Sequence, residues 1–426
     1  MKTKKLHSKE SEFISLEEFF LPSKRIYRDA FRSVGIPNIR PALRKIKGKS
    51  EVDIYDYELL FNDEPTKKIM REGNTIGCFY VESPGMRSLL KRLQCDTFEM
   101  LTAASSVIRP GVAESGMMRE FIARHKNPAQ RKYLLPEMEK YLGETYGVMI
   151  YQEDVIKIAH HVAGLTLEEA DLLRRAMSGK MRSHKAMKQI EKRFFDSCRK
   201  KKMAPQIAKE LWRQIESFAG YAFSKAHSAS FALLSFQVAY LKAHYPAEFM
   251  ASVLNNRGGY YSAAVYVREA VRLGIKILLP DVNASLYEYV AGKDEIRIGF
   301  MAVKNLSVLS ARKIVDERKK NGKYVSLIDF LIRTRLAYEE TATLIRCGAM
   351  SSFNQTRPTL MRLLDVYLSI ANYTTKAATV FSAPRVSNWK KKSKRRSSIR
   401  LKKFAPLSLK RSVIWSANTR WNFSPK

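Results

Sequence analysis

The chain has 426 residues, of which 45% are apolar and 11% aromatic, enough for two or three domains with buried cores. Lys and Arg number 76 against 41 Asp and Glu, and the resulting net charge of +35 makes a polyanion the expected partner. The sequence lacks the run of roughly eighteen apolar residues that a membrane span needs, and no apolar segment follows its N-terminal charges. We therefore expect a soluble, cytoplasmic protein with no membrane partner.

The cysteines argue against a zinc site and against a disulfide framework. Cys78, Cys95, Cys198 and Cys347 lie far apart, form no C-x-x-C pair and have no histidine at ligand spacing. This usage fits a reducing cytosol.

The first 125 residues show weak periodicity. Residues 1–50 are basic and interrupted by prolines, so we interpret them as a basic lead-in. In residues 51–125 short segments alternate with turns. The stretch IGCFYVE at 76–82 is rich in β-forming side chains and predicts a strand that ends at Ser83-Pro84-Gly85. A helix is predicted directly after it.

Residues 126–290 predict a helical domain. Thr166 and Glu169 have the spacing of a capping box ahead of an apolar helical repeat. Residues 207–223 repeat this pattern and are broken at Gly220. Residues 228–245 are apolar on nearly every face and stop before a proline, which predicts a buried helix.

The C-terminal part predicts a smaller mixed module and a tail. A helix is expected over 261–274, short strands over 275–280 and 296–300, and two helix-turn-helix units within 291–355, the second capped by Gly348. Residues 372–426 are rich in Lys, Arg and Ser without any acid, which predicts a disordered basic tail. The expected fold class is mainly α with small β elements, an α+β protein.

No metal-holding or catalytic carboxylates can be identified. Nucleotidyl transfer uses two metal ions, and Asp-x-Asp on one strand is the economical way to hold them. The sequence contains no Asp-x-Asp. Glu10 and Glu12, and Glu137 and Glu139, have this spacing but lie in a charged terminus and ahead of a helical pattern, where solvated faces are the simpler interpretation.

Phosphate-binding candidates gather in two places. Arg174, Arg175 and Lys180 lie close together around a Ser-Gly turn that can offer backbone N–H groups. The alternative for them is a solvated basic face. Lys225, His227 and Ser228 precede the predicted buried helix, where a helix N-terminus favours anions.

Purely structural roles are equally open for Ser228 and His227. Ser228 has the chemistry of an N-cap, and His227 that of a structural histidine. Further along, Lys304 and Asn305 lie in a small polar turn before a helix, a type of turn that presents N–H groups to DNA phosphates. The alternative there is an ordinary helical hairpin that binds nothing.

Several segments, taken in order, resemble the bacterial C-family DNA polymerases, that is the DNA polymerase III alpha subunit and its error-prone relatives. The resemblance covers about residues 51–350. It is carried by GCFYVESPGMRSLLKRL (77–93), SSVIRPGVAESGMM (105–118), TYGVMIYQEDVIKIAHHVAGLTLEEADLLRRAMSGK (145–180), FAGYAFSKAHSASFALLSFQVAYLKAHYPAEFMASVLNN (218–256) and ILLPDVNAS (277–285).

The resemblance implies a function for each part of the chain. Residues 1–50 become a palm remnant, 51–125 the palm edge and start of the fingers, 126–290 the fingers, and 291–355 a helix-hairpin-helix region. It favours phosphate binding by the basic residues above. It also implies that Arg109, Gln152, His227 and Ser228 line the nucleotide and template cleft. Mg²⁺, deoxynucleoside triphosphates, primer-template DNA and other replisome or polymerase chains are the implied cofactor and partners.

The sequence departs from the family pattern in its palm and its hairpin. If Gly35 belongs to the family's Leu-Gly turn, Arg32 occupies the position of a palm Asp, and Asp29 is three residues away. The paired Asp residues of the palm strand and the amino-terminal phosphoesterase-like domain have no counterpart. Asn305 and Ser307 stand where the family tends to have Gly, and Ser adopts positive φ poorly, so weakened DNA contact is expected there.

Three interpretations follow. The first is a DNA-directed DNA polymerase alpha-subunit fragment that binds nucleotide and template-primer DNA for replication or error-prone repair, with little activity on its own. The second is a non-catalytic DNA-binding remnant of such a polymerase. The third is a degenerate polypeptide. The tail has no likeness in the family, so we also hypothesise a truncated or frame-shifted gene product. GCFYVESPGMR favours the error-prone branch.

Overall fold

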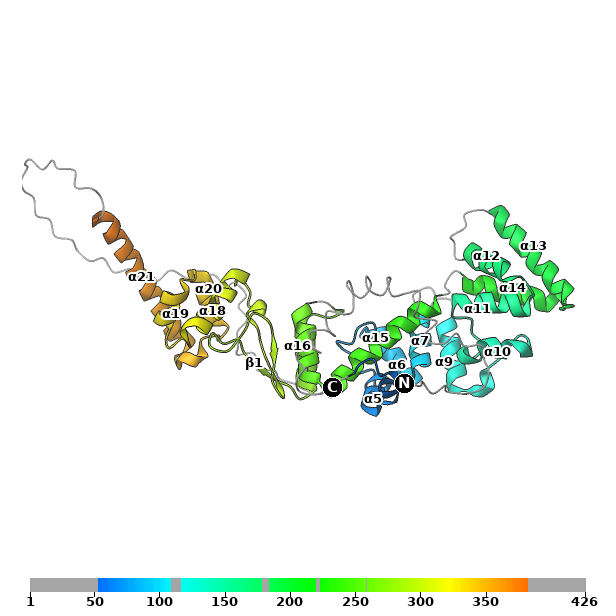
Figure 1. The fold of residues 1–426 in the computed structure, drawn as a ribbon, viewed down its shortest axis with the longest axis horizontal. Coiled ribbons are helices and arrows are strands. Elements are labelled where there is room, and N and C mark those ends of the chain that lie inside the picture. The colour runs from blue at the N-terminus through cyan, green and yellow to red at the C-terminus, as the bar shows by residue number, and fades with distance from the viewer. Residues whose placement is uncertain (1–52, 109–115, 178–183, 220–222, 258, 382–426) are drawn as a thin grey trace, which may run out of the picture. The chain divides into compact units, whose positions relative to one another are not determined.

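The computed structural model describes residues 53–108, 116–177, 184–219, 223–257 and 259–381 (Figure 1). Over these residues the chain divides into two compact units. The first unit contains the described residues up to Leu278 together with Tyr289–Arg297, and the second contains Leu279–Glu288 and the described residues from Ile298 onward. Both are mainly helical, and the first also holds a three-stranded sheet. The predicted α+β class is confirmed.

The first part of the first unit is built around the long helix α15 (Lys225–His244), which lies beside α7 in Figure 1. Its faces carry small or apolar side chains, and Phe61 meets Phe236 edge to face with 5.2 Å between ring centroids. The predicted buried helix is confirmed, and it begins at Lys225 rather than at 228. The helices that pack on α15 are α4 (Tyr57–Asn62), α5 (Glu64–Arg71), α7 (Phe98–Val107) and α16 (Pro246–Asn256). Around α6 (Pro84–Leu93) lie α5, α7 and α9 (Met117–Lys126).

A fully buried lysine ties α15 to its neighbours. The Lys242 ammonium donates to Glu269 Oε1 at 2.6 Å and to the backbone carbonyls of Asn74 and Ile76 at 2.6 and 2.7 Å. These acceptors use all three of its N–H groups. Glu269 also accepts from Arg272, at 2.8 Å to each oxygen. The buried charges are therefore compensated on both sides.

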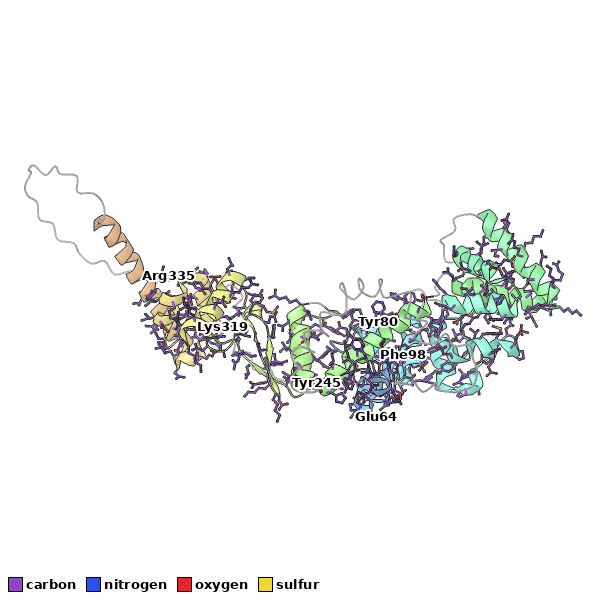
Figure 2. All side chains as sticks on the ribbon, viewed as in Figure 1. Glu64, Tyr80, Phe98, Tyr245, Lys319 and Arg335 are labelled. Atoms are coloured by element: carbon purple, nitrogen blue, oxygen red, sulfur yellow. The ribbon has the colours of Figure 1, made fainter. Side chains whose placement is uncertain are left out.

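The strand predicted over residues 76–82 is wrong. These residues form consecutive turns, because Gly77 and Tyr80 adopt positive φ angles of 85° and 70°. The buried Glu82 carboxylate accepts the Gly77 N–H at 2.9 Å, and it also accepts the Tyr260 N–H at 2.7 Å and the Tyr266 hydroxyl. Figure 2 labels Tyr80 at this turn. Contacts far along the chain thus fold the β-prone segment back on itself.

The second part of the first unit is a helical subdomain with its own core. Thr166 and Glu169 form the predicted capping box, because each side chain accepts the other's backbone N–H, at 3.1 and 3.2 Å. The rings of Phe194 and Trp212 pack in the core with 5.0 Å between their centroids, and Leu173 belongs to the same core. The elements are η3 (Pro128–Gln130), η4 (Pro136–Met138), α10 (Glu139–Leu142), η5 (Gly143–Thr145), α11 (Gln152–Lys157), the π-helix η6 (Ile158–Val162), α12 (Leu167–Met177), α13 (His184–Lys200) and α14 (Pro205–Ala219).

A small sheet follows α17 (Ala263–Arg272), as the sequence predicts. Its strands are β1 (Lys276–Leu278), β2 (Val290–Ala291) and β3 (Glu295–Arg297), in the order β1-β3-β2. β1 pairs parallel with β3 and β2 pairs antiparallel with it. β3 is therefore the centre of the sheet, although it comes last in the chain.

The second unit packs two helical pairs around one core that includes Phe330 and Leu344. Gly348 follows the last residues of α20 with φ +83°, and its N–H donates to the Ile345 carbonyl at 3.0 Å, so its predicted capping role is confirmed. The elements are η7 (Phe300–Ala302), α18 (Val308–Asn321), α19 (Leu327–Thr334), α20 (Tyr338–Arg346), η8 (Ser351–Phe353) and α21 (Arg357–Phe381).

The C-terminal end differs from the predicted disordered tail in its first residues. α21 continues to Phe381, so residues 372–381 are helical, consistent with an Ala-containing segment whose single charge is Lys376. The remainder of the predicted tail lies outside the described residues. No helix in the described part of the chain is long and apolar enough to cross a membrane.

Candidate functional site

Three of the residues singled out from the sequence meet in the first unit. Arg174 at the end of α12 donates from Nη1 to Oε1 of Gln152, the first residue of α11, at 3.0 Å. The Gln152 N–H donates to the Phe223 carbonyl at 2.9 Å, and the Phe223 N–H donates to the Ile150 carbonyl at 3.2 Å. This bridge brings the start of α15 to the start of α11, and the Lys225 ammonium lies 5.4 Å from the centroid of the Tyr151 ring.

Carboxylates fix the cations of this cluster. Arg174 donates to Asp171 Oδ1 at 2.9 Å from Nε and at 2.7 Å from Nη2, and Arg175 Nη2 lies 2.6 Å from Asp171 Oδ2. The hydrogen bonds from Arg174 hold the pKa of Asp171 below its usual range. The Lys225 ammonium donates to Glu144 at 2.6 Å. Each cation therefore has a defined position before any ligand arrives.

The start of α15 is held in the same way. The Lys225 backbone N–H donates to Glu153 Oε2 at 3.0 Å, and the Ser224 hydroxyl donates to the other Glu153 oxygen at 3.3 Å. Ser224 is the N-cap residue of α15, so the alternative in which Ser228 is the N-cap is wrong. Ser228 lies in the first turns of the helix instead, fully buried, with its hydroxyl 2.7 Å from that of Ser106.

His227 is exposed and packs against two aromatic rings. Its ring lies between those of Phe223 and Phe231, at centroid distances of 5.0 and 4.5 Å. The predicted site residues Arg109 and Lys180 lie outside the described residues, as does the Ser-Gly turn before Lys180. The described cluster is thus formed by Gln152, Arg174, Arg175 and Lys225.

Asp154 is a residue that the sequence reasoning missed. It lies in the first turn of α11, and its carboxylate accepts the N–H groups of Ile150 and Tyr151 at 3.0 and 2.9 Å. Burial raises the pKa of Asp154 to about 7, despite these two hydrogen bonds. A carboxylate three residues after the N-cap residue Tyr151 was the available signal, but nothing local indicated its burial.

Tyr151 forms the floor below Lys225. Its side chain is buried, and none of the described residues hydrogen-bonds its hydroxyl. Burial keeps the pKa of Tyr151 well above its usual range, so the hydroxyl is neutral. A neutral aromatic face beneath an ammonium group is a favourable cation–π arrangement.

The polar turn of the second unit contains the predicted residues Lys304 and Asn305. Asn305 has φ +59°, but Ser307 has φ −69° and caps α18 by accepting the Ser310 N–H at 3.1 Å. Ser307 therefore needs no positive φ, so the reason given for weakened DNA contact at this position is wrong. Glu340 from α20 accepts the Ser307 N–H at 3.0 Å and the Ser310 hydroxyl at 2.7 Å.

The carboxylates considered as metal ligands do not assemble in the described structure. Glu10 and Glu12 lie outside the described residues, and Glu137 and Glu139 are exposed. Among the described ranges, no group of three or more His, Cys, Asp or Glu side chains is placed to hold a metal ion. The described residues thus do not offer the ligand set that Mg²⁺ would need, and no chemical step is assigned to them.

Two family models match the chain at these units. Residues 37–202 match the bacterial DNA polymerase III alpha subunit finger domain, and residues 274–360 match a helix-hairpin-helix motif. The finger match begins within the expected lead-in and ends before residue 290. The class of protein is therefore a polymerase finger domain followed by a helix-hairpin-helix region.

Curated relatives agree with these matches. The DNA polymerase III subunit alpha of Campylobacter jejuni is 38% identical over 330 residues, 76% of this chain and 27% of that protein. The Thermus aquaticus protein of this name is 39% identical over 340 residues, 77% and 27% of the two chains. That of Staphylococcus epidermidis is 35% identical over 339 residues, 78% and 31%.

The chain belongs to the family of bacterial DNA polymerase III alpha subunits. It spans about 27 to 31% of the length of these relatives.

Proposed function

We propose that this chain binds incoming deoxynucleoside triphosphate and template-primer DNA as the finger and helix-hairpin-helix part of a DNA-directed DNA polymerase. Chromosome replication and error-prone repair synthesis are the processes it would serve, in the cytoplasm. The observation that carries the proposal is the meeting of Gln152, Arg174 and Lys225 from three helices of the finger-matched unit. Arg109 and Lys180 join the proposed site through the family resemblance alone.

The pairing of the cations supports a phosphate role. Guanidinium groups bind phosphate oxygens through paired N–H donors, and Arg174 already directs two of its N–H groups, Nε and Nη2, to the single oxygen Oδ1 of Asp171. A triphosphate carries more negative charge than the single carboxylate that it would displace. Arg174 and Lys225 are also partly exposed, with 19% and 23% of their side chains accessible. A triphosphate can therefore reach both cations and replace their carboxylate partners.

Ser228 and His227 take different parts in this proposal. The buried Ser228 hydroxyl stabilises the start of α15 through Ser106 and does not face a ligand. The exposed His227 ring, flanked by two phenylalanines, offers a stacking surface for a base. Lys304 and Asn305 would contact the DNA backbone from the second unit.

Nucleotide addition itself is assigned to metal-holding carboxylates outside the described residues. In the family's chemistry, Mg²⁺ neutralises the triphosphate and activates the attacking hydroxyl. We therefore propose that another segment or a partner polymerase chain supplies the palm. Little or no primer extension is expected from this chain alone.

Titration of the whole chain with primer-template DNA and a fluorescent deoxynucleoside triphosphate tests the proposal. Arg174→Ala and Lys225→Ala should each weaken nucleotide binding about tenfold or more, since each removes a charge-assisted contact. Arg213→Ala is the matched control, because Arg213 on α14 also pairs with a nearby carboxylate, Glu210, but lies outside the cluster. Unchanged affinity in both cluster variants would overturn the proposal.

One observation favours the second candidate, a DNA-binding protein without the reaction. Arg312, Lys313 and Lys319 on α18 are exposed and form no ion pair among the described residues. Such cations bind a phosphate backbone without reading nucleotide. Steeply salt-dependent DNA binding that nucleotide leaves unchanged would select this candidate over the first.

A further inference from the structure

A surface hollow of about 510 Å³ lies beside the turn that joins α13 to α14. Its floor is apolar and is formed by Leu135, Val162, Met203 and Ile207, while Lys201 and Lys202 stand at its rim. This volume falls within the range of about 300–1,000 Å³ that is typical of ligand pockets. The hollow shares no lining residue with the nucleotide cluster.

The floor of the hollow is an uncovered edge of the subdomain core. Val162 is fully buried in that core, whereas Leu135 and Met203 pack against it and stay partly exposed. The partly exposed Leu135 and Met203 gain free energy from a partner that removes them from water, whereas Val162 is already buried. The hollow therefore favours an apolar side chain over a charged or strongly hydrated one.

The wall of the hollow is held in place by the π-helix η6. The Lys201 ammonium donates to the His161 carbonyl, which anchors the α13–α14 turn to η6. The His161 ring stacks on Tyr141 with 4.6 Å between centroids and 4° between planes. Isolated π-helical turns recur at functional sites. These contacts fix the shape of the hollow before a ligand arrives.

The rim carries a run of positive charge. Lys201 and Lys202 line the hollow, and the exposed Arg199 and Lys200 directly precede them in the chain. Arg199 pairs with Asp196 at 3.3 Å, but no described acid forms an ion pair with Lys200 or Lys202. The remaining rim acid is the exposed Glu137. The apolar floor thus lies directly beside Lys202, which forms no ion pair among the described residues.

We propose that the α13–α14 hollow docks an acidic protein segment that carries a large apolar side chain. The apolar side chain fills the floor, and neighbouring carboxylates face Lys200 and Lys202. Charge complementarity selects an acidic partner, since opposite potentials across an interface set specificity. The floor selects protein over DNA, because the charged phosphates of a DNA backbone would lose their hydration against apolar side chains.

Fluorescence anisotropy with the whole chain and a short labelled peptide tests this proposal. The probe has two central leucines flanked by aspartates and glutamates. Two matched peptides replace either the leucines by serines or the acids by their amides. Only the acidic, leucine-containing peptide should bind well, because the floor and the rim both contribute.

Variants of the chain distinguish the hollow from its general positive charge. Lys202→Glu should weaken binding of the probe about fivefold or more, and Met203→Ser should weaken it without changing the charge. Lys209→Glu is the matched control, because Lys209 is exposed on α14 and does not line the hollow. Lys202 is exposed, so its substitution should leave thermal unfolding unchanged.

Three results would overturn the proposal. The first is equal loss of binding in Lys202→Glu and Lys209→Glu. The second is equal binding of the serine-containing peptide. The third is displacement of the probe by a double-stranded oligonucleotide whose affinity falls in Lys202→Glu as much as that of the probe. This result would mean that the surface binds polyanions in general. Nucleotide affinity, measured in parallel, should stay unchanged in every one of these variants.

Discussion

Two groups of cations, one in each unit of the chain, are held differently. In the first unit, Arg174 and Lys225 are each fixed by a carboxylate and only partly exposed. In the second, Arg312, Lys313 and Lys319 project from α18 without an ion pair among the described residues, and Figure 2 labels Lys319 there. Fixed cations favour a ligand of defined geometry, whereas unpaired ones respond to charge alone. The contrast predicts selective binding at the Arg174 and Lys225 cluster and salt-sensitive binding at α18.

The largest expected effect is on stability and concerns Lys242, a fully buried cation that is held by Glu269. Lys242→Met leaves two backbone carbonyls without their donor and Glu269 with Arg272 as its only described cation. We expect the free energy of unfolding to fall by about 3–5 kcal/mol, the usual cost of breaking a buried pair. Urea denaturation measures it. The exposed Lys209→Met should change stability by no more than about 0.5 kcal/mol, and a similarly small effect at Lys242 would contradict the expectation.

The next effect is a pH dependence of the free energy of unfolding, which arises from Asp154 in the first unit. The folded pKa of Asp154, about 7, lies above its ordinary value of 3.8, so the folded protein binds more protons between these values. Asp154 therefore favours folding at low pH, and this contribution is lost as the pH rises towards 7. Relative to Asp154→Asn, the parent chain should lose up to about 3 kcal/mol between pH 5 and pH 8. If the free energy of unfolding changed equally with pH in both proteins across this range, the effect would be ruled out.

The smallest effect tests the unpaired cations of the second unit. Arg312→Ala combined with Lys313→Ala should weaken DNA binding about tenfold at moderate salt and reduce the slope of log K against log salt by about 2. Arg174→Ala should weaken nucleotide binding but leave the slope of log K for DNA against log salt nearly unchanged. If Arg174→Ala altered the slope as much as the α18 double variant does, the two units would not differ in the way their cations bind.

Local sequence patterns predicted the elements whose causes are local. The capping box at Thr166, the buried helix α15 and the cap at Gly348 depend on neighbours within a few residues. The turn at 76–82 could not be predicted, because Glu82 is satisfied by Tyr266, far along the chain. The burial of Ser228 could not be predicted for the same reason, since its partner Ser106 is 122 residues away.

The candidate site was predicted only in part. Its basic residues stood out in the sequence, and Gln152 was added through the family resemblance. The acids that fix them, Glu144 and Glu153, were not identified, because they lie 81 and 72 residues from Lys225. A pairing of opposite charges across such distances leaves no periodic signal in one sequence.

The interleaved path of the chain between its two units limits how they can be separated. Residues 279–288 belong to the second unit, yet the chain then returns for Tyr289–Arg297, which supplies β2 and the central strand β3. No single proteolytic cut can therefore release either unit whole. A truncation after residue 290 would remove β3, the strand with which β1 pairs, so biochemical dissection has to keep both units on one polypeptide.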